Sequence, residues 1–253
     1  MQIVVIGGTG LIGAKVVRRL TGHGHTAIVA SPSSGVNTLT GDGLAAALDG
    51  ADVVVDVSNA PSFADQAVLE FFRTSTANIL AAAAAAGVGH LVALSVVGAQ
   101  RLAESGYFRA KIVQEELIGA GELAYSIVQA TQFFEFVGAI ADAATVDGTV
   151  RLAPAPFQPI AAADVAAAVG VTAASVPVLG TVEVAGPQRF RLDELVRQHL
   201  AGRGDPRLVV TDPQARYFGA PLDEHTLIPR PDALFARTRF EDWQAVTGTT
   251  VGR

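Results

Sequence analysis

Short, continuous apolar runs alternate with longer segments of helical periodicity over roughly the first 145 residues. Such runs, closed by glycine or polar residues, predict buried strands, whereas apolar positions repeating every three or four residues predict helices. The expected strands lie at 2–6, 26–30, 51–57, 90–95 and 125–129. The helices expected between and after them lie at 14–20, 63–86, 107–118 and 132–144.

Strands that are apolar throughout, rather than at every second residue, need cover on both faces. Alternation with helices therefore predicts an α/β fold with a doubly wound parallel sheet. Beyond residue 147, Pro154, Pro156 and Pro159 interrupt the pattern, and we expect an alanine-rich helix at 161–174 and a sixth strand at 181–185. From residue 186 onward, prolines and scattered charges predict a small, less regular lobe.

The 253 residues are enough for one large domain with a modest appended lobe. We therefore expect a single domain over 1–253, with a core at about 1–150 and an interleaved C-terminal region at 151–253 that caps a substrate. Half of the residues are hydrophobic and 17% are charged, as in a packed globular protein. The chain has no cysteine, which excludes disulfides, thiolate nucleophiles and cysteine-ligated metals.

A formal net charge of -6 argues against a nucleic-acid partner, and we interpret the arginines at 189, 191, 197, 203 and 207 as a solvated face. No basic leader precedes the first strand, and the most apolar later stretch, 79–88, is too short to span a bilayer. We expect a cytoplasmic location and no membrane segment. His90, His199 and His225 show no metal-ligand spacing, so no metal site is expected.

A glycine-rich loop, Gly7-Gly8-Thr9-Gly10-Leu11-Ile12-Gly13, joins the first expected strand to the first helix. Glycines allow a tight turn and a close approach of the backbone to a phosphate, and the free amides at the helix N-terminus stabilise the anion. The bare spacing is a weak signal, but its position between strand and helix predicts a dinucleotide site. The residues expected to contact the pyrophosphate are Gly7, Thr9, Gly10, Leu11, Ile12 and Gly13.

The segment after the second strand, Ser31-Pro32-Ser33-Ser34, decides between the two nicotinamide cofactors. An acidic residue there would bind the ribose 2'-hydroxyl of NAD and repel the 2'-phosphate of NADP. No acid is present, and Ser31, Ser33 and Ser34 offer hydroxyl donors. NADP is therefore favoured, with NAD possible. Lys15 and Arg18 are the only cations near in sequence.

A tyrosine and a lysine, Tyr107 and Lys111, stand four residues apart in an expected helix and can both point into one cleft. A nearby ammonium favours the phenolate and would lower the pKa of the tyrosine toward neutrality. Ser95 ends the preceding strand at the edge where α/β sheets bind ligands, so its hydroxyl could hold a substrate carbonyl oxygen.

These motifs resemble the short-chain dehydrogenase/reductase superfamily, and specifically its atypical, NmrA-like or NAD(P)H-binding members, over roughly residues 1 to 170. The resemblance rests on the glycine loop, Gly41-Asp42, Ser95, the Tyr107/Lys111 pair, and the segments 130–134 and 159–166. It implies a Rossmann fold and an NAD(P)-dependent oxidoreductase acting on a small, apolar carbonyl or quinone. Oligomeric state is left open.

The resemblance also implies individual roles. Tyr107 would donate a proton to a carbonyl during hydride transfer, Lys111 would bind the nicotinamide ribose, and Ser95 would orient the substrate. Asp42 would lie near the adenine, and Asn59 and Thr131 near the ribose or nicotinamide.

The sequence departs from the superfamily pattern after the third expected strand, where Val57-Ser58-Asn59-Ala60-Pro61 stands, and Asn78 is the only weak candidate for the usual catalytic asparagine. Some NmrA-like proteins bind the dinucleotide without turnover, so a non-catalytic NADP-binding redox sensor is the alternative. A sugar-nucleotide epimerase or dehydratase is less favoured because little chain remains for a sugar lobe. Phe133, Phe134 and Phe136 could floor an apolar pocket, although core packing is the commoner role.

Overall fold

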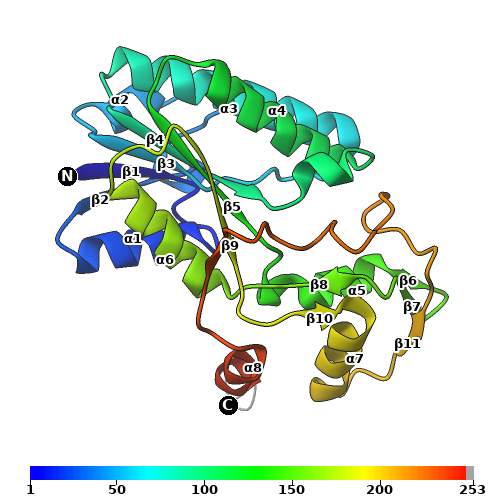
Figure 1. The fold of residues 1–253 in the computed structure, drawn as a ribbon. Coiled ribbons are helices and arrows are strands. Elements are labelled where there is room, and N and C mark those ends of the chain that lie inside the picture. Colours follow the sequence, from blue (N-terminus) through cyan, green and yellow to red (C-terminus); the bar gives the residue numbers. More distant parts are fainter. Residues whose placement is uncertain (249–253) are drawn as a thin grey trace.

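The computed structural model describes residues 1–248, and its centre is a seven-stranded parallel sheet (Figure 1). The strand order is β12-β9-β5-β4-β3-β1-β2. The strands are β1 (Gln2–Ile6), β2 (Thr26–Ala30), β3 (Val53–Asp56), β4 (His90–Val96), β5 (Tyr125–Ala130), β9 (Gly180–Ala185) and β12 (Leu234–Phe235). The order reverses beside β1, and ligands of doubly wound sheets bind at such a switch point.

Helices cover both faces of this sheet (Figure 1). On one face lie α2 (Leu44–Leu48), α3 (Asp65–Ala85) and α4 (Gly106–Ala120), and on the other lie α1 (Gly13–Gly22) and α6 (Ala162–Ala173). The side chains of β1 divide between the two resulting cores: Val4 packs toward α2 and α3, and Val5 packs toward α1 and α6. The doubly wound α/β architecture predicted from the apolar runs is therefore confirmed.

The remaining elements form a lobe beyond the carboxyl ends of β4 and β5, at the lower right of Figure 1. Its helices are α5 (Val137–Ala143) and α7 (Leu192–Gly202), and α8 (Phe240–Gly248) follows β12. Its strands are β6 (Thr145–Val146), β7 (Thr149–Leu152), β8 (Pro156–Phe157), β10 (Phe190–Arg191) and β11 (Leu208–Thr211). They form the sheet β11-β7-β6 and the pair β10-β8.

The predicted elements differ from the structure where distant segments intervene. The α-helix expected at 132–144 begins only at Val137, after a 3-10 turn at Phe134–Phe136. Backbone hydrogen bonds of Gln132 and Phe134 with Ile160, both 2.9 Å, hold the intervening Phe133 extended. β3 ends at Asp56 because its partner β1 ends at Ile6. The lobe is more regular than expected, and β12 returns from it to the main sheet.

The arginines of the C-terminal third are less freely solvated than expected. Arg191 and Arg197 both contact the carboxylate of Asp193, which is fully buried. Arg207 binds Asp205 and Asp142. Within residues 1–248 no helix has the length and apolar character needed to cross a membrane.

Candidate functional site

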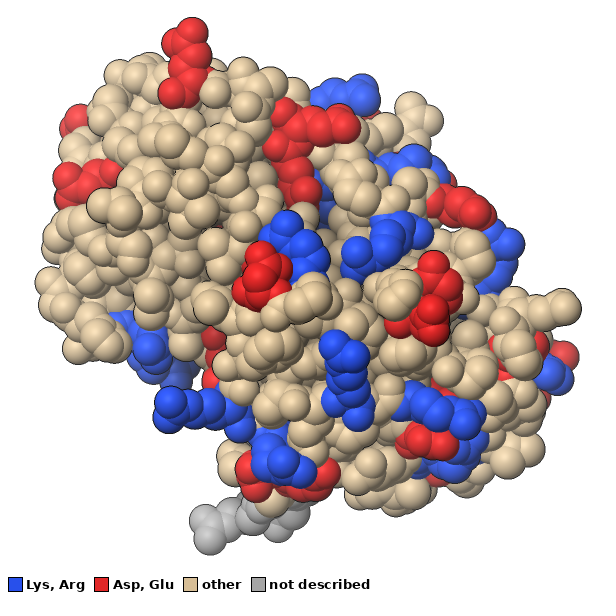
Figure 2. Space-filling model, viewed as in Figure 1, with Lys and Arg blue, Asp and Glu red and all other residues tan. Residues whose placement is uncertain are grey.

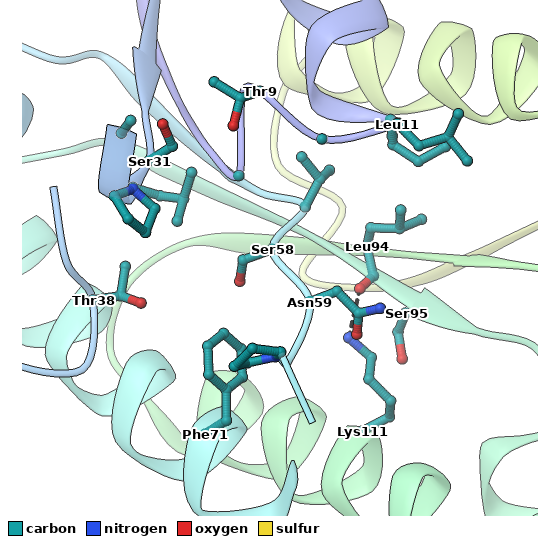
Figure 3. A pocket seen from close by; sticks show the side chains of 18 of the residues that line it. Thr9, Leu11, Ser31, Thr38, Ser58, Asn59, Phe71, Leu94, Ser95 and Lys111 are labelled. Atoms are coloured by element: carbon teal, nitrogen blue, oxygen red, sulfur yellow. Dashed lines mark hydrogen bonds between the residues drawn. The ribbon is translucent and has the colours of Figure 1, made fainter. Parts of the chain in front are cut away.

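A cavity of about 550 Å³ lies at the carboxyl ends of β1 to β5, where the strand order reverses. Figure 3 shows its two ends, with Thr9, Ser31 and Thr38 on one side and Ser95 and Lys111 on the other. The lining comes mainly from the glycine loop, the end of β2, the loop 36–39, the segment 57–61, the end of β4, α4, and Phe133 with Phe136. Phe71 of α3 adds to it.

Steric contacts require glycine at several positions of the loop, including Gly8, where a Cβ would lie 2.8 Å from the carbonyl oxygen of Val5. Gly7 has a φ of +77°, and a Cβ there would lie 2.9 Å from the backbone of Ser58. A Cβ on Gly13 would lie 2.1 Å from the carbonyl oxygen of Gly7. At Gly10 the nearest contact would be a tolerable 3.3 Å, because that residue borders the open cavity. The loop therefore presents bare backbone to a ligand.

Backbone amides at the start of α1 point to the chemistry of that ligand. The N–H groups of Leu11, Ile12 and Gly13 donate to no other group within the described part of the chain. Unpaired amides at a helix N-terminus bind anions, and the positive end of the helix dipole adds to the attraction. The arrangement fits a pyrophosphate, as the sequence predicted.

Of the three serines expected to contact the adenosine half of the cofactor, only one lines the end of the cavity beside β2. Ser31 lines the cavity, whereas Ser33 and Ser34 lie outside its lining. Their hydroxyls are bonded locally: Ser31 Oγ lies 2.9 Å from Ser33 Oγ, and Ser34 Oγ donates to the carbonyl oxygen of Ser31 at 3.0 Å. No carboxylate is among the lining residues that the structure describes.

The two cations nearest to this segment in sequence do not line the cavity. Lys15 and Arg18 line a second pocket between α1 and α6, and the only charged residue in the described lining of the main cavity is Lys111. Their proximity in sequence therefore does not bring either cation to the end of the cavity beside Ser31. A helix that begins at the phosphate site turns these side chains away from the sheet edge.

A loop that the sequence analysis did not single out closes the adenosine end. Asn37, Thr38 and Leu39 line the cavity, and Asn78 of α3 donates from Nδ2 to the carbonyl oxygens of Thr38 (2.8 Å) and Leu39 (3.1 Å). Asn78 thus holds this loop and is no part of a proton relay. Asp42 is exposed, accepts a hydrogen bond from Thr40 and does not line the cavity.

Tyr107 and Lys111 occupy adjacent turns of α4, and both line the cavity, as their spacing predicted. Burial raises the pKa of Tyr107 to about 12, opposite to the expected lowering. The phenol lies among Phe63, Phe72 and Phe108, with ring centroids at 5.6, 6.2 and 5.4 Å. This apolar surrounding disfavours the phenolate, so the phenol is protonated at neutral pH.

The ammonium of Lys111 is bonded within the protein. Its Nζ donates to the carbonyl oxygen of Leu94 at 2.8 Å (Figure 3). Nζ also donates to Oε1 of Gln114 and lies 4.4 Å from the ring centroid of Phe72. Burial lowers the pKa of Lys111 to about 8, with Asp56 and Glu115 acting in the opposite direction. The lysine therefore titrates near the physiological range.

Two groups of buried polar residues beneath the cavity were missed by the sequence analysis. Asp56 ends β3 and accepts hydrogen bonds from Ser58 (Oγ, 2.6 Å) and from Gln114 (Nε2, 2.9 Å), which links it to Lys111. An acid directly after an apolar Val-Val-Val run was the available signal. Acids or amides at strand ends on this edge are placed for ligand chemistry.

Glu115 forms the second group with Ser95 and Gln129. The hydroxyl of Ser95 donates to Oε1 of Glu115, which also accepts from Gln129 Nε2 at 2.8 Å. Because its proton is bound by a carboxylate, the Ser95 hydroxyl presents lone pairs rather than a donor to the cavity. The expectation that it holds a carbonyl oxygen as a donor is not met in this arrangement.

Of the remaining residues considered in the sequence analysis, some line the cavity and others are buried behind it. Asn59 lines the cavity, and its Oδ1 accepts from the amide of Ala60 at 3.0 Å. Thr131 is fully buried behind the lining, with no partner for its hydroxyl within residues 1–248. Phe133 and Phe136 line the cavity with stacked rings 5.3 Å apart, whereas Phe134 is core.

A parallel sheet with a glycine loop at its switch point, facing a cavity that extends to a tyrosine and a lysine on α4, is typical of a dinucleotide-binding Rossmann protein. The model of the NAD(P)H-binding family matches residues 7–173. The chain belongs to this family.

One curated relative is the photosystem II assembly factor Ycf39 of Synechocystis, 25% identical over 149 residues. The match covers 53% of this chain and 46% of that protein, so the chain matches less than half of the relative's length.

Solved structures with this fold include the dTDP-glucose 4,6-dehydratase DesIV of Streptomyces venezuelae, with a TM-score of 0.72 and 18% identity over 98% of this chain and 95% of that one. Another is the NADPH-dependent quinone oxidoreductase QOR2 of Escherichia coli, with a TM-score of 0.63 and 20% identity over 83% of this chain and 77% of that one. Chain length therefore does not separate this protein from the sugar-nucleotide enzymes, contrary to the expectation from the sequence.

Proposed function

We propose that the protein is an NADP-dependent oxidoreductase that reduces a carbonyl or a quinone-like small molecule, with Tyr107 as the proton donor. The observation that carries the proposal is the placement of Tyr107 and Lys111 on the same cavity as the glycine loop. An NAD(P)H-binding family and an oxidoreductase-type fold support the general reaction class.

The protonation state of Tyr107 favours the direction of reduction. A phenol whose pKa is raised to about 12 is protonated at pH 7 and can supply a proton, whereas it is a poor base for oxidising an alcohol. When bound, the nicotinamide supplies a hydride to the carbonyl carbon. Tyr107 then transfers its proton to the carbonyl oxygen, and solvent returns a proton to the phenolate.

The remaining residues of the cavity would bind and orient. Leu11, Phe71, Phe133 and Phe136 offer apolar and aromatic surface near Tyr107, which suits a flat, apolar substrate. QOR2, one of the structures with this fold, is described as acting on quinones. The side chain of Lys111 extends from α4 to the carbonyl oxygen of Leu94 in β4, where its ammonium would meet the ribose hydroxyls of the nicotinamide half.

The NADP preference rests on the absence of an acid from the described lining beside Ser31. Thermal unfolding tests it, because a ligand that binds only the native state stabilises by RT ln(1 + [L]/Kd). We expect NADPH to raise Tm more than NADH at equal concentration. Equal or greater protection by NADH would overturn the preference.

The catalytic proposal is tested with Tyr107→Phe, using Tyr217→Phe as the matched control. Tyr217 is also buried, lies next to Phe108 with a 6.3 Å centroid separation, and does not line the cavity. Against a panel of quinones and carbonyls, we expect Tyr107→Phe to lower kcat by about 10²–10⁴-fold at unchanged NADPH affinity, and Tyr217→Phe to keep it. Equal turnover by wild type and Tyr107→Phe would show that Tyr107 is not the proton donor.

A second function, non-catalytic NADP sensing, is favoured by the hydrogen bonds of Ser95 and Lys111, which engage both groups within the protein. The relative from Synechocystis is named as an assembly factor. NADPH binding without turnover across the whole panel would support this function over the enzymatic one.

A further inference from the structure

A second pocket, of about 360 Å³, lies between α1 and α6, away from the cofactor cavity, with which it shares no lining residue. Helix α1 contributes cationic side chains to it, and α6 contributes only the small side chains of Ala163 and Ala166. The residues from α1 and its end are Lys15, Arg18, Arg19, Gly22 and His23. Figure 2 shows basic side chains at the lower left, where Figure 1 places α1.

The spacing of the cations brings them onto one face of the helix. Lys15, Arg18 and Arg19 stand at positions i, i+3 and i+4, which are neighbours on a helix surface. The stem of Arg19 packs on α6 at Gly170, where a Cβ would lie 3.4 Å from the Cδ of Arg19, an ordinary contact distance. The guanidinium is thus positioned by packing at the edge of the pocket.

No acidic side chain neutralises this group. Within residues 1–248, Lys15, Arg18 and Arg19 take part in no ion pair and no side-chain hydrogen bond, although acids outnumber bases in the chain, 24 to 18. Several arginines of the C-terminal third, by contrast, are paired with acids: Arg191, Arg207, Arg216 and Arg230.

The carboxylate of α6 nearest in sequence to the pocket is engaged in another contact. Oδ2 of Asp164 accepts a hydrogen bond from the amide of Thr238 at 3.2 Å. At the other end, Nδ1 of His23 donates to the carbonyl oxygen of Arg19 at 2.7 Å, leaving its second ring nitrogen free to face a ligand.

This arrangement is electrostatically unfavourable without a ligand. Like charges three or four residues apart on a helix surface repel each other and destabilise the helix. Lys15 also lies in the first turn of α1, where the helix dipole disfavours a cation, and that turn holds no acid. An anion between the side chains would remove both penalties.

We propose that the pocket between α1 and α6 binds a phosphate-bearing anion, as a site separate from the dinucleotide site. Two guanidinium groups and an ammonium match the geometry and charge of a phosphate or pyrophosphate, since arginine forks bind its oxygens in pairs. The volume is roughly ten times the ~30 Å³ share of one water molecule, so it accepts a phosphate with an attached group. A small phosphorylated molecule and a phospholipid headgroup present the same chemistry.

Calorimetric titration with inorganic pyrophosphate tests the site on protein saturated with NADPH, so that the glycine loop is already filled, at constant ionic strength set with chloride. The variant is Arg18→Gln/Arg19→Gln, and the matched control is Arg73→Gln, an exposed arginine of α3 without an ion pair among the described residues. We expect saturable binding to wild type and to Arg73→Gln, weakened at least tenfold in the double variant.

A second arm, sedimentation with vesicles of phosphatidylcholine with or without a phosphoinositide, identifies the source of the phosphate. Saturable binding in either arm that the double variant loses sustains the proposal. Binding that is equal in wild type and the double variant, or absent from both arms, overturns it. NADPH affinity of the double variant is the folding check, and its value should not change because neither arginine lines the cofactor cavity. The proposal does not depend on the catalytic role of Tyr107.

Discussion

Removing the buried ammonium of Lys111 should change how the stability of the protein depends on pH. Lys111 is 3% exposed, and burial lowers its pKa from 10.5 to about 8. Between these values the unfolded chain binds a proton that the folded chain does not, so the free energy of unfolding rises with pH. The penalty of charging the buried lysine is present below pH 8 and is relieved as pH increases toward 10.5.

The size of the effect follows from linkage. Each pH unit between the folded and unfolded pKa values adds about 1.4 kcal/mol to the free energy of unfolding. From pH 8 to pH 9.5 the gain is therefore about 2 kcal/mol. Tyr107 acts in the opposite direction only at higher pH, because its raised pKa contributes stability that is complete below pH 10 and is lost toward pH 12.

The assay compares urea unfolding of wild type, Lys111→Met and Lys111→Arg from pH 7 to 9.5. Methionine is neutral and arginine is charged throughout this range, so neither variant titrates there. The compared quantity is the slope of the free energy of unfolding against pH. Other titrating groups contribute equally to the slope in each protein, and the hydrogen bonds to Leu94 and Gln114 that the methionine loses change only the offset. Wild-type and variant curves that run parallel would refute the reasoning.

Two further substitutions test the walls of the cofactor cavity. Gly13→Ala should abolish NADPH binding and lower the free energy of unfolding by about 1–3 kcal/mol, because its Cβ would lie 2.1 Å from a loop carbonyl oxygen. The matched control is Gly22→Ala in the same helix, where an added Cβ would have no atom within 4 Å, so NADPH binding and the free energy of unfolding should be unimpaired. Equal effects of the two substitutions on NADPH affinity in calorimetry and on stability in urea unfolding would contradict the steric argument. Asn78→Ala should lower the free energy of unfolding by about 1–3 kcal/mol and weaken NADPH binding, because the carbonyl oxygens of Thr38 and Leu39 lose their hydrogen-bond donor. Unchanged NADPH affinity would show that this loop does not contact the cofactor.

Local patterns predicted much of the core fold. The runs at 2–6 and 26–30 match β1 and β2 because continuous apolar strands have few other ways to be buried. The short strands of the lobe and α2 carried no such pattern. Tertiary hydrogen bonds also overrode the helical periodicity at Gln132, whose backbone pairs with Ile160.

For the candidate site, spacing predicted that Tyr107 and Lys111 face one cavity, but not the environment of either. The raised pKa of Tyr107 comes from aromatic rings on α3 and its own helix, and Gln114 and Leu94 determine where the ammonium points. The role of Asn78 depends on a loop 40 residues earlier in the chain. Such contacts join segments that sequence spacing does not relate.

The sequence by itself determined features that rest on local chemistry: the alternation of strands and helices in the core, and a glycine loop between the first strand and helix in which Gly13 would meet the loop's own carbonyl oxygen if it carried a Cβ. Only the tertiary structure decided the hydrogen bonds of Ser95, and that Lys15 and Arg18 face a separate pocket. Periodicity encodes which face of an element is buried. Which distant side chain meets that face depends on how the elements pack, and packing sets the local charge and dielectric on which chemistry depends.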